Sequence, residues 1–379
     1  MSDSVTTVTG KRTWKPQDNG LYVKIGNTIF NNFSSFQFSR DIEQVPSTFQ
    51  MEVPIDGSTI PSGIQDNQQC TIYKNKKQVF HGYMEVFSTS MSGNKQHGMF
   101  ISGRSKLRDL CDPNPEIAGT AINNVQGMSD LCQVLCDTYG IKFQNLSKTP
   151  DKTAWNSVPF NLGDTAFSVI SRYARYEGKL LYDNGYGDLI VNDCSSDIVC
   201  TFNENSQITN ATYQSDLTQR FKEYHVYWQP FTTQSQTGLP PVMKALDPEP
   251  TIWSGVERTK VIINSTSDED GSIAQRLANW EANRNYGRSK QVYITVPDWK
   301  DSDVLYDVNQ LCEVNLPYLN VYNMKMIISS VSYSYSNEQG STVTLVLYPR
   351  EAFMFEPVSL FTSNPALQSL PQDSGSKTT

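Results

Sequence analysis

The chain has 379 residues, which is too many for a single hydrophobic core and predicts two to four domains. Charged residues make up only 18% and the formal net charge is −8, so a surface that grips nucleic acid tightly is not expected. Hydrophobic residues make up 38%, with 19 Tyr and 17 Phe, a composition that favours sheets and long turns over helical bundles.

The N-terminal residues 1–17 are polar and carry no apolar segment, so we expect a short N-terminal arm and no signal peptide. No stretch approaches the length of a membrane helix, so membrane insertion is not expected. The seven cysteines are odd in number and scattered along the chain. They predict free, mostly buried thiols in a protein made in a reducing cytoplasm.

The first part of the chain alternates apolar and polar residues in short runs. These runs predict roughly six strands within about 90 residues, a density that is typical of a small barrel or sandwich. We therefore predict a first β-barrel over residues 18–111, completed by strands near residues 198–218. The runs are residues 21–30, 33–40, 49–53, 70–73, 78–88 and 98–102.

Helical periodicity then replaces the alternation. Residues 128–139 and 165–176 carry apolar side chains at helical spacing, and each of these segments is followed by a glycine that can end the helix. Residues 179–182 and 189–192 predict a hairpin. Together these segments predict an inserted α/β domain over residues 112–197.

Sheet character returns after the insert. The alternation of Tyr224, Val226 and Trp228 predicts one long strand over residues 211–228, and the Pro-, Gln- and Thr-rich residues 230–250 predict a loop. Acidic residues then precede a predicted helix over residues 272–288, where they suit its positive N-terminus. Residues 219–290 are expected to form a connector with a strand and a helix that contributes in part to the second barrel.

The last part of the chain predicts a second β-barrel over residues 291–355, from runs at 291–296, 310–314, 324–335 and 342–348. Residues 356–379 lack clear periodicity and predict a C-terminal tail that stays disordered until bound. The predicted class is mainly β with an α/β insert (α+β), with two small β-barrel domains of similar fold.

No group of residues predicts catalysis, a metal site or a cofactor site. His81, His97 and His225 lie in or beside predicted strands without the spacing of zinc ligands. Cys132 and Cys136 fit one buried helix face better than a redox pair. A pair of carboxylates for glycoside cleavage stays open, with nominal candidates Glu85, Glu116, Glu177 and Glu223, although no neighbouring residues mark any of them.

The most informative segment runs from Gly82 to Asp112, where the first barrel passes into the insert. Gly103, Arg104 and Asp109 are predicted to form a structural junction there. We expect Arg104 to anchor the junction by hydrogen bonds to backbone carbonyls or to a carboxylate, and assign it no catalytic role.

Three motifs in fixed order resemble the late control protein D family of contractile-tailed phages. They are ISGRSKLRDLCD at 101–112, QRFKEYHV at 219–226 and LYPREAF at 347–353. The family includes the baseplate hub of phage Mu, the hub of T-even phages and the hub part of the valine-glycine repeat spike proteins of type VI secretion. The resemblance covers about residues 18–358.

The resemblance implies a structural hub in the tail baseplate of the virion, assembled in the host cytoplasm. It implies a homotrimeric ring that joins a hexameric tail tube to a trimeric central spike and forms part of the DNA channel. Wedge or sheath proteins are further possible partners. The candidate residues for contact with the spike or a neighbouring subunit lie in the tail, at Glu356, Pro357, Leu360 and Phe361.

The alternative hypothesis is a tail component that binds or degrades cell-wall glycans. It is motivated by the tyrosine-rich strands and the unassigned carboxylates. The weakly acidic charge of the chain favours the hub, because a lumen that attracted phosphate would slow DNA ejection.

Overall fold

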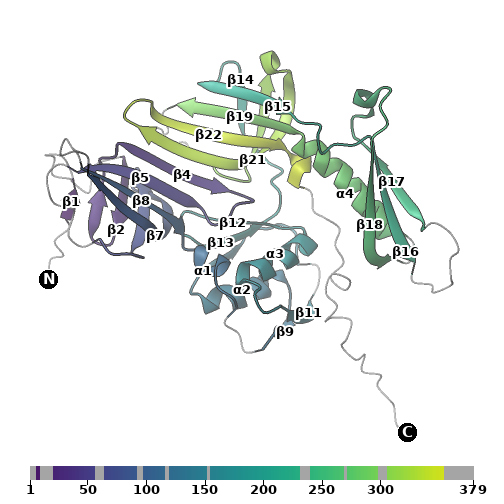
Figure 1. Ribbon diagram of the computed structural model, residues 1–379, viewed down its shortest axis with the longest axis horizontal. Helices are drawn as coiled ribbons and strands as arrows, with labels where there is room; N and C mark the ends of the chain where they lie inside the picture. The colour runs from purple at the N-terminus through teal and green to yellow at the C-terminus, as the bar shows by residue number, and fades with distance from the viewer. Residues whose placement is uncertain are drawn as a thin grey trace, which may run out of the picture.

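The computed structural model describes residues 6–8, 20–55, 64–91, 97–115, 119–151, 154–230, 240–268, 271–297 and 305–353. The chain forms one large sheet, a compact insert and a smaller unit of sheet and helix (Figure 1). The predicted class, mainly β with an α/β insert, is confirmed. None of the described helices is both long and apolar enough to cross a membrane. Apart from β1 (Thr6–Val8), the predicted arm lies outside the described residues, as does the whole tail.

The body of the molecule is a sheet of 14 strands. Its first half, called the first half-sheet below, has the order β1-β3-β2-β6-β7-β8-β5-β4. Every second side chain of β4 and β5 is buried, so each strand gives one face to the core. The bounds are β2 (Leu21–Ile25), β3 (Thr28–Phe30), β4 (Ser35–Asp41), β5 (Thr48–Ile55), β6 (Gln69–Lys74), β7 (Lys77–Met91) and β8 (His97–Ser105).

The second half-sheet continues directly from the first. Strands β4 and β21 pair in antiparallel register, which places Phe38 opposite Tyr333 and stacks their rings with centroids 5.9 Å apart. One hydrophobic core extends through both halves. The two predicted barrels are therefore joined in one hydrogen-bonded sheet. The bounds are β14 (Ile198–Asn203), β15 (Asn210–Ser215), β19 (Lys290–Pro297), β20 (Leu311–Leu316), β21 (Val321–Ser336) and β22 (Gly340–Pro349).

The strands that follow the insert belong to the second half-sheet. Strand β14 pairs with β20 and β15 pairs with β19, so the prediction that residues 198–218 complete the first barrel is wrong. Hydrogen bonds at the exit of the insert explain the path. Asn309 accepts from the backbone of Ser195 at 3.0 Å and donates to the carbonyl of Asp193 at 2.9 Å, which brings the chain to the second half-sheet.

The parallel register of β14 and β20 also places Cys200 opposite Cys312. The two residues form a disulfide, with their Cα atoms 4.9 Å apart. The expectation of free thiols is therefore wrong for this pair, because 112 residues separate the two cysteines in sequence and only the fold brings them together. The other five cysteines are free, namely Cys70, Cys111, Cys132, Cys136 and Cys194.

The insert has its own hydrophobic core between α2 and α3. Helix α3 begins at Thr165, whose hydroxyl accepts from the Ser168 amide at 3.1 Å, and ends at Gly178 in the left-handed conformation. The elements are α1 (Arg108–Cys111), β9 (Ala121–Val125), α2 (Met128–Thr138), β10 (Phe143–Asn145), β11 (Trp155–Pro159), α3 (Ala166–Glu177), β12 (Leu180–Asp183) and β13 (Leu189–Asn192). Strands β9 and β11 were not predicted, because both are short and interrupted by polar residues.

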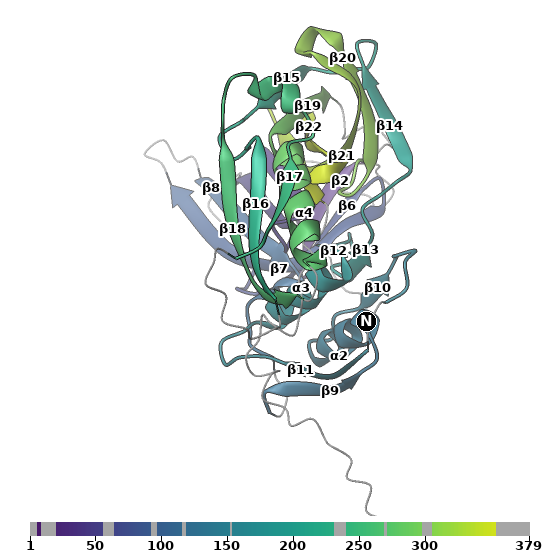
Figure 2. The same ribbon diagram turned by 90° about the vertical axis from the view of Figure 1, so that its right-hand side faces the viewer.

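The connector is a three-stranded sheet, β17-β16-β18, with α4 packed on one face (Figure 2). A stripe of Ala274, Ala278 and Ala282 on α4 lets the helix approach Tyr224 and Val226 of β16 closely. The bounds are β16 (Glu223–Pro230), β17 (Val242–Leu246), β18 (Thr259–Asp268) and α4 (Ser272–Arg288), with 3₁₀ helices η1 (Pro250–Trp253), η2 (Pro317–Leu319) and η3 (Arg350–Phe353).

The connector corrects two predictions. The single strand expected over residues 211–228 is two strands in different sheets, β15 and β16. A turn separates them, since Asp216 accepts from the Thr218 amide at 2.8 Å and the buried Arg220 then fixes the chain. Strand β17 lies within residues 230–250, where a loop was expected.

Candidate functional site at the junction of the units

The predicted junction residue Gly103 lies in β8, between β5 and β7. A Cβ atom at this position would overlap the Tyr83 carbonyl and approach the Phe49 ring to 2.9 Å. Gly82, on the facing strand, meets the Arg104 carbonyl in the same way. Both glycines are needed for the close approach of two backbones, so this is a packing site rather than a turn.

Arg104 bonds to two carboxylates from different elements. Its guanidinium donates to Glu85 of β7 at 2.8 Å and to Asp112, beyond α1, at 2.6 Å. Arg108 donates to the same Glu85 at 2.9 Å and contacts the predicted junction residue Asp109 at 3.3 Å. The carboxylate partners expected for Arg104 are thus present. That they hold the junction together stays a prediction, because these groups are partly exposed.

The ion pairs change the acidity of the carboxylates. Burial alone would raise the pKa of Glu85, but hydrogen bonds from Arg104 and Arg108 outweigh it and lower that pKa. The hydrogen bond from Arg104 also lowers the pKa of Asp112. Glu85 is therefore held ionised between two arginines, which does not suit the proton donor that glycoside cleavage requires.

The residue that joins the two half-sheets to the insert is Arg40 of β4, which sequence reasoning missed. Its side chain is 6% exposed and donates to both oxygens of Asp307, at 2.7 and 2.8 Å. Its Nε lies 3.5 Å from Asp183 of β12, and its Nη2 donates to the Val79 carbonyl at 3.1 Å. One guanidinium thus contacts the first half-sheet, the insert and the segment that leads into the second half-sheet.

Asp183 is tied to the first half-sheet a second time. It is 1% exposed and accepts from both the backbone and the hydroxyl of Ser47, at 3.1 and 2.5 Å. Burial alone would lower the pKa of Arg40, but Asp307 and Asp183 outweigh it and raise that pKa, so the guanidinium stays charged. We call Arg40, Ser47, Asp183 and Asp307 the arginine joint.

Two further arginines, one within the connector and one at its boundary with the large sheet, pair with carboxylates. Arg220 is 1% exposed and donates to Asp247, which is fully buried, at 2.6 Å through each of two nitrogens. The same guanidinium reaches Glu249 at 3.0 Å. At the end of α4, Arg288 pairs with Glu43, which lies beyond β4. Of these two pairs, the buried one lies within the connector, and the partly exposed one, Arg288 with Glu43, joins the connector to the large sheet.

A buried lysine forms a similar ion pair inside the insert. Lys179 is 1% exposed and donates to Asp193 at 3.1 Å and to the Thr149 carbonyl at 2.7 Å. Burial alone would raise the pKa of Asp193, but hydrogen bonds from Thr149, Ser147 and Lys179 outweigh it and lower that pKa below its usual range. This cluster fixes the end of β13, where the chain leaves the insert.

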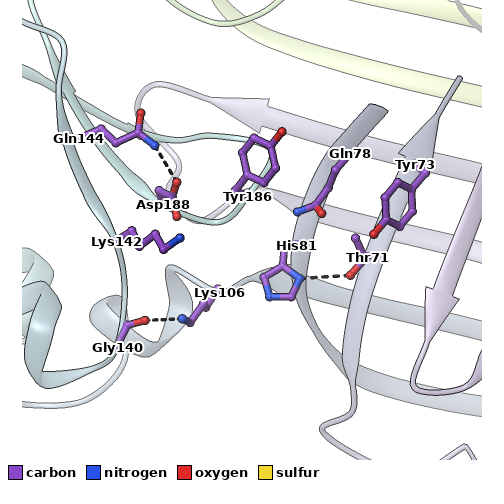
Figure 3. Close-up of a pocket in the computed structure, with 10 residues that line it drawn as sticks. All are labelled: Thr71, Tyr73, Gln78, His81, Lys106, Gly140, Lys142, Gln144, Tyr186 and Asp188. Atoms are coloured by element: carbon purple, nitrogen blue, oxygen red, sulfur yellow. Dashed lines mark hydrogen bonds between the residues drawn. The ribbon is translucent and has the colours of Figure 1, made fainter. Parts of the chain in front are cut away.

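A polar cavity of about 620 Å³ opens where the first half-sheet meets the insert (Figure 3). On one wall His81 bonds to Thr71 at 3.2 Å, and on the other Gln144 donates to Asp188 at 2.8 Å. The Lys142 side chain points between them (Figure 3). Burial lowers the pKa of His81, and none of the lining residues is a cysteine or a serine that this base could activate. The cavity is therefore a polar space at the interface between the first half-sheet and the insert.

The remaining candidates for chemistry are not brought together. Glu85, Glu177 and Glu223 come from three different units, and Glu116 lies outside the described residues. The Nε2 atom of His225 forms a hydrogen bond with a carboxylate oxygen of Glu223, 2.7 Å away. Among the described residues, no group of three His, Cys, Asp or Glu could hold a metal ion.

The helix cysteines show no sign of reactivity. Burial raises the pKa of the Cys136 thiol to about 12 and places that of Cys132 well above its usual value. Both side chains belong to the core of the insert. They therefore behave as small apolar residues.

Models of protein families match successive parts of the chain. The N-terminal domain of "Mu phage baseplate assembly protein GpP-like" matches residues 20–105. The second domain of "Baseplate hub protein gp44-like" matches residues 108–193, and the fourth domain of "Mu phage baseplate assembly protein GpP" matches residues 270–356. Together these matches cover more than half of the chain.

Solved structures share the fold. The 43 kDa tail protein of prophage MuSo2 from Shewanella oneidensis has a TM-score of 0.77 at 20% identity, over 89% of this chain and 100% of that one. A tail protein from Neisseria meningitidis MC58 has a TM-score of 0.70 at 16% identity, over 89% and 99%. A type VI secretion component from Escherichia coli has a TM-score of 0.54 at 11% identity, over 89% and 79%. No curated protein sequence matches the chain.

The glycine contacts generate a first prediction. Gly103→Ala should lower the free energy of unfolding by about 2 kcal/mol, because the added methyl forces β7 and β8 apart. Gly98→Ala is the matched control, since its Cβ meets only the flexible Ser90 side chain in the same strand pair. Chemical denaturation measures both. Equal stabilities for the two variants would contradict the packing role of Gly103.

The arginine joint generates a second prediction. Arg40→Met should cost about 3 kcal/mol, because it leaves Asp183 buried without its cation. Arg104→Met, in the partly exposed cluster, should cost about 1 kcal/mol or less. Adding Asp183→Asn to Arg40→Met should recover part of the loss. A larger loss for Arg104→Met, measured by denaturation, would show that the exposed cluster is the stronger tie.

The lowered pKa of Asp193 generates a third prediction. A carboxylate whose pKa is lower in the folded state stabilises the fold above its unfolded pKa of about 3.9, and loses that stabilisation as pH falls through the folded value. Between about pH 5 and pH 2, wild-type protein should therefore lose more unfolding free energy than Asp193→Asn. Parallel pH profiles for the two proteins would refute the role of this carboxylate.

Proposed function

This chain belongs to the baseplate hub proteins of Mu-like phages, a component of the phage tail, and from that premise we propose that three copies form its working state. The ring would join a hexameric tail tube on one side to a trimeric central spike on the other. DNA would pass through its lumen without specific binding, and assembly would take place in the host cytoplasm. Wedge or sheath proteins would contact its outside.

The observation that carries this proposal is the pairing of β4 with β21. It joins two half-sheets of comparable size within one chain, over one continuous core. Three such chains would present six half-sheets around an axis, a number that suits six tube subunits. The same ring has true threefold symmetry, which a trimeric spike can share.

The ion pairs between units also support the proposed ring. A ring that transmits load from spike to tube needs its two half-sheets in a fixed relation. The arginine joint ties both half-sheets and the insert to one buried cation. The net charge of −8 further suits a lumen that DNA crosses, since phosphate is not attracted.

The tail has a separate place in the proposal. Residues 356–379, with Glu356, Pro357, Leu360 and Phe361, lie outside the described residues. Their contact with the spike or with a neighbouring subunit stays a prediction.

Mass photometry of the purified full chain tests the proposal. We expect a main species at three times the 42.7 kDa of one chain, which persists on dilution to the nanomolar range. Mixing with the tail tube protein should give a larger complex, while a peptidoglycan zymogram should stay blank. A monomer at high concentration would refute the ring, and clearing of the zymogram would favour the glycan hypothesis.

A further inference from the structure

A second cavity, of about 580 Å³, lies where the residues after β4 meet α3, α4 and η3. Apolar side chains from three elements line it, among them Phe167 of α3, Trp280 of α4 and Phe353 of η3. Arg175 and Arg284 line the same cavity from α3 and α4. We call this cavity the α3–α4 groove. Its apolar and cationic lining suits an apolar segment that carries a carboxylate.

The arginines of the groove are not all neutralised. Arg288 pairs with Glu43, whereas neither Arg175 nor Arg284 forms an ion pair with a described residue. The Arg284 guanidinium lies over the Trp280 ring, 5.3 Å from its centroid. The lining thus contains three arginines, Arg175, Arg284 and Arg288, and one carboxylate, that of Glu43. The groove therefore carries excess positive charge beside an apolar surface.

The chain itself supplies a matching segment. The described residues end at Phe353, which lines the groove, and the sequence continues as MFEPVSLF over residues 354–361. Five of these eight residues are apolar side chains other than proline, and Glu356 is the first charge. At about 3.3 Å per residue, three residues span about 10 Å, so Glu356 lies within reach of the groove.

We propose that residues 354–361 occupy the α3–α4 groove of their own chain, with Glu356 paired to Arg175 and Arg284. Attachment at Phe353 makes this binding intramolecular, and a short tether gives the segment a millimolar effective concentration at the groove. The docked segment is a strap that ties the insert, through α3, to the connector, through α4.

The strap rests on the lining of the groove and on the exit of the chain, and does not depend on the hub function. It gives Glu356, Pro357, Leu360 and Phe361 a contact within the subunit. Residues 362–379 then remain as the part of the tail that can reach the spike or a neighbouring subunit.

Charge reversal in the full chain tests the strap, with chymotrypsin cleavage after Phe361, whose neighbouring residues no variant changes, as the readout. Glu356→Arg should speed this cleavage about tenfold, because cleavage follows the population of undocked segment. Cleavage after Leu367, farther along the tail, should not change and is the internal reference. The double variant Arg175→Glu/Arg284→Glu should give the same acceleration.

Combining all three substitutions restores opposite charges, and should return cleavage close to the wild-type rate. Arg276→Glu is the control for a charge change elsewhere on α4, since Arg276 is exposed and does not line the groove. Circular dichroism confirms that each variant is folded. Acceleration without rescue by the triple variant would overturn the pairing.

Protection that appears only as protein concentration rises would overturn the intramolecular strap and assign the groove to a second copy. Protection that appears only with spike protein present would also overturn it. Mass photometry of the same variants separates the two proposals, because the ring should persist when the strap is released.

Discussion

One buried guanidinium contacts both halves of the large sheet and the insert. Arg40 contacts three acceptors at the same time. They are the carboxylate of Asp183 in the insert, the carboxylate of Asp307 before β20 and the backbone carbonyl of Val79 in β7. A charge in this position is stable only when its partners are held in place, since desolvation otherwise exceeds the attraction. The geometry of the joint and the relative orientation of the two half-sheets and the insert therefore depend on each other.

Ion pairs of the same kind occur elsewhere in the molecule, within units as well as between them. Arg288 with Glu43 joins the connector to the large sheet, Arg220 with Asp247 lies within the connector, and Lys179 with Asp193 lies within the insert. Hydrophobic cores stabilise the units, and the core of the large sheet extends to Leu180, Tyr182 and Ile190 of the insert. Directional ion pairs at Arg40 and Arg288 add further contacts between units. For a hub, a fixed relation between half-sheets matters more than the stability of either half alone.

The local pattern of the sequence predicted most of the elements. Alternating burial in β4 and β5, and the glycine after α3, follow directly from residue spacing. The pattern could not predict which edges meet, because pairing between distant strands depends on contacts far apart in sequence. The placement of β14 and β15 in the second half-sheet, and the disulfide of Cys200 with Cys312, are examples.

The junction shows the same limit at single residues. Arg104 could be singled out from the sequence because the Gly-Arg pair marks the end of a predicted strand. The structure gives this arginine carboxylate partners in a partly exposed cluster. Arg40 has an ordinary position in an alternating strand, and its partners Asp183 and Asp307 lie 143 and 267 residues away. Only the folded chain shows that this arginine is buried.

Electron cryomicroscopy of the assembled full chain tests the central claim most directly. The account predicts a threefold ring in which the paired β4 and β21 strands of each copy place six half-sheets around an open channel. A ring of six copies, a closed centre, or half-sheets of one chain separated at the β4–β21 pair would contradict it.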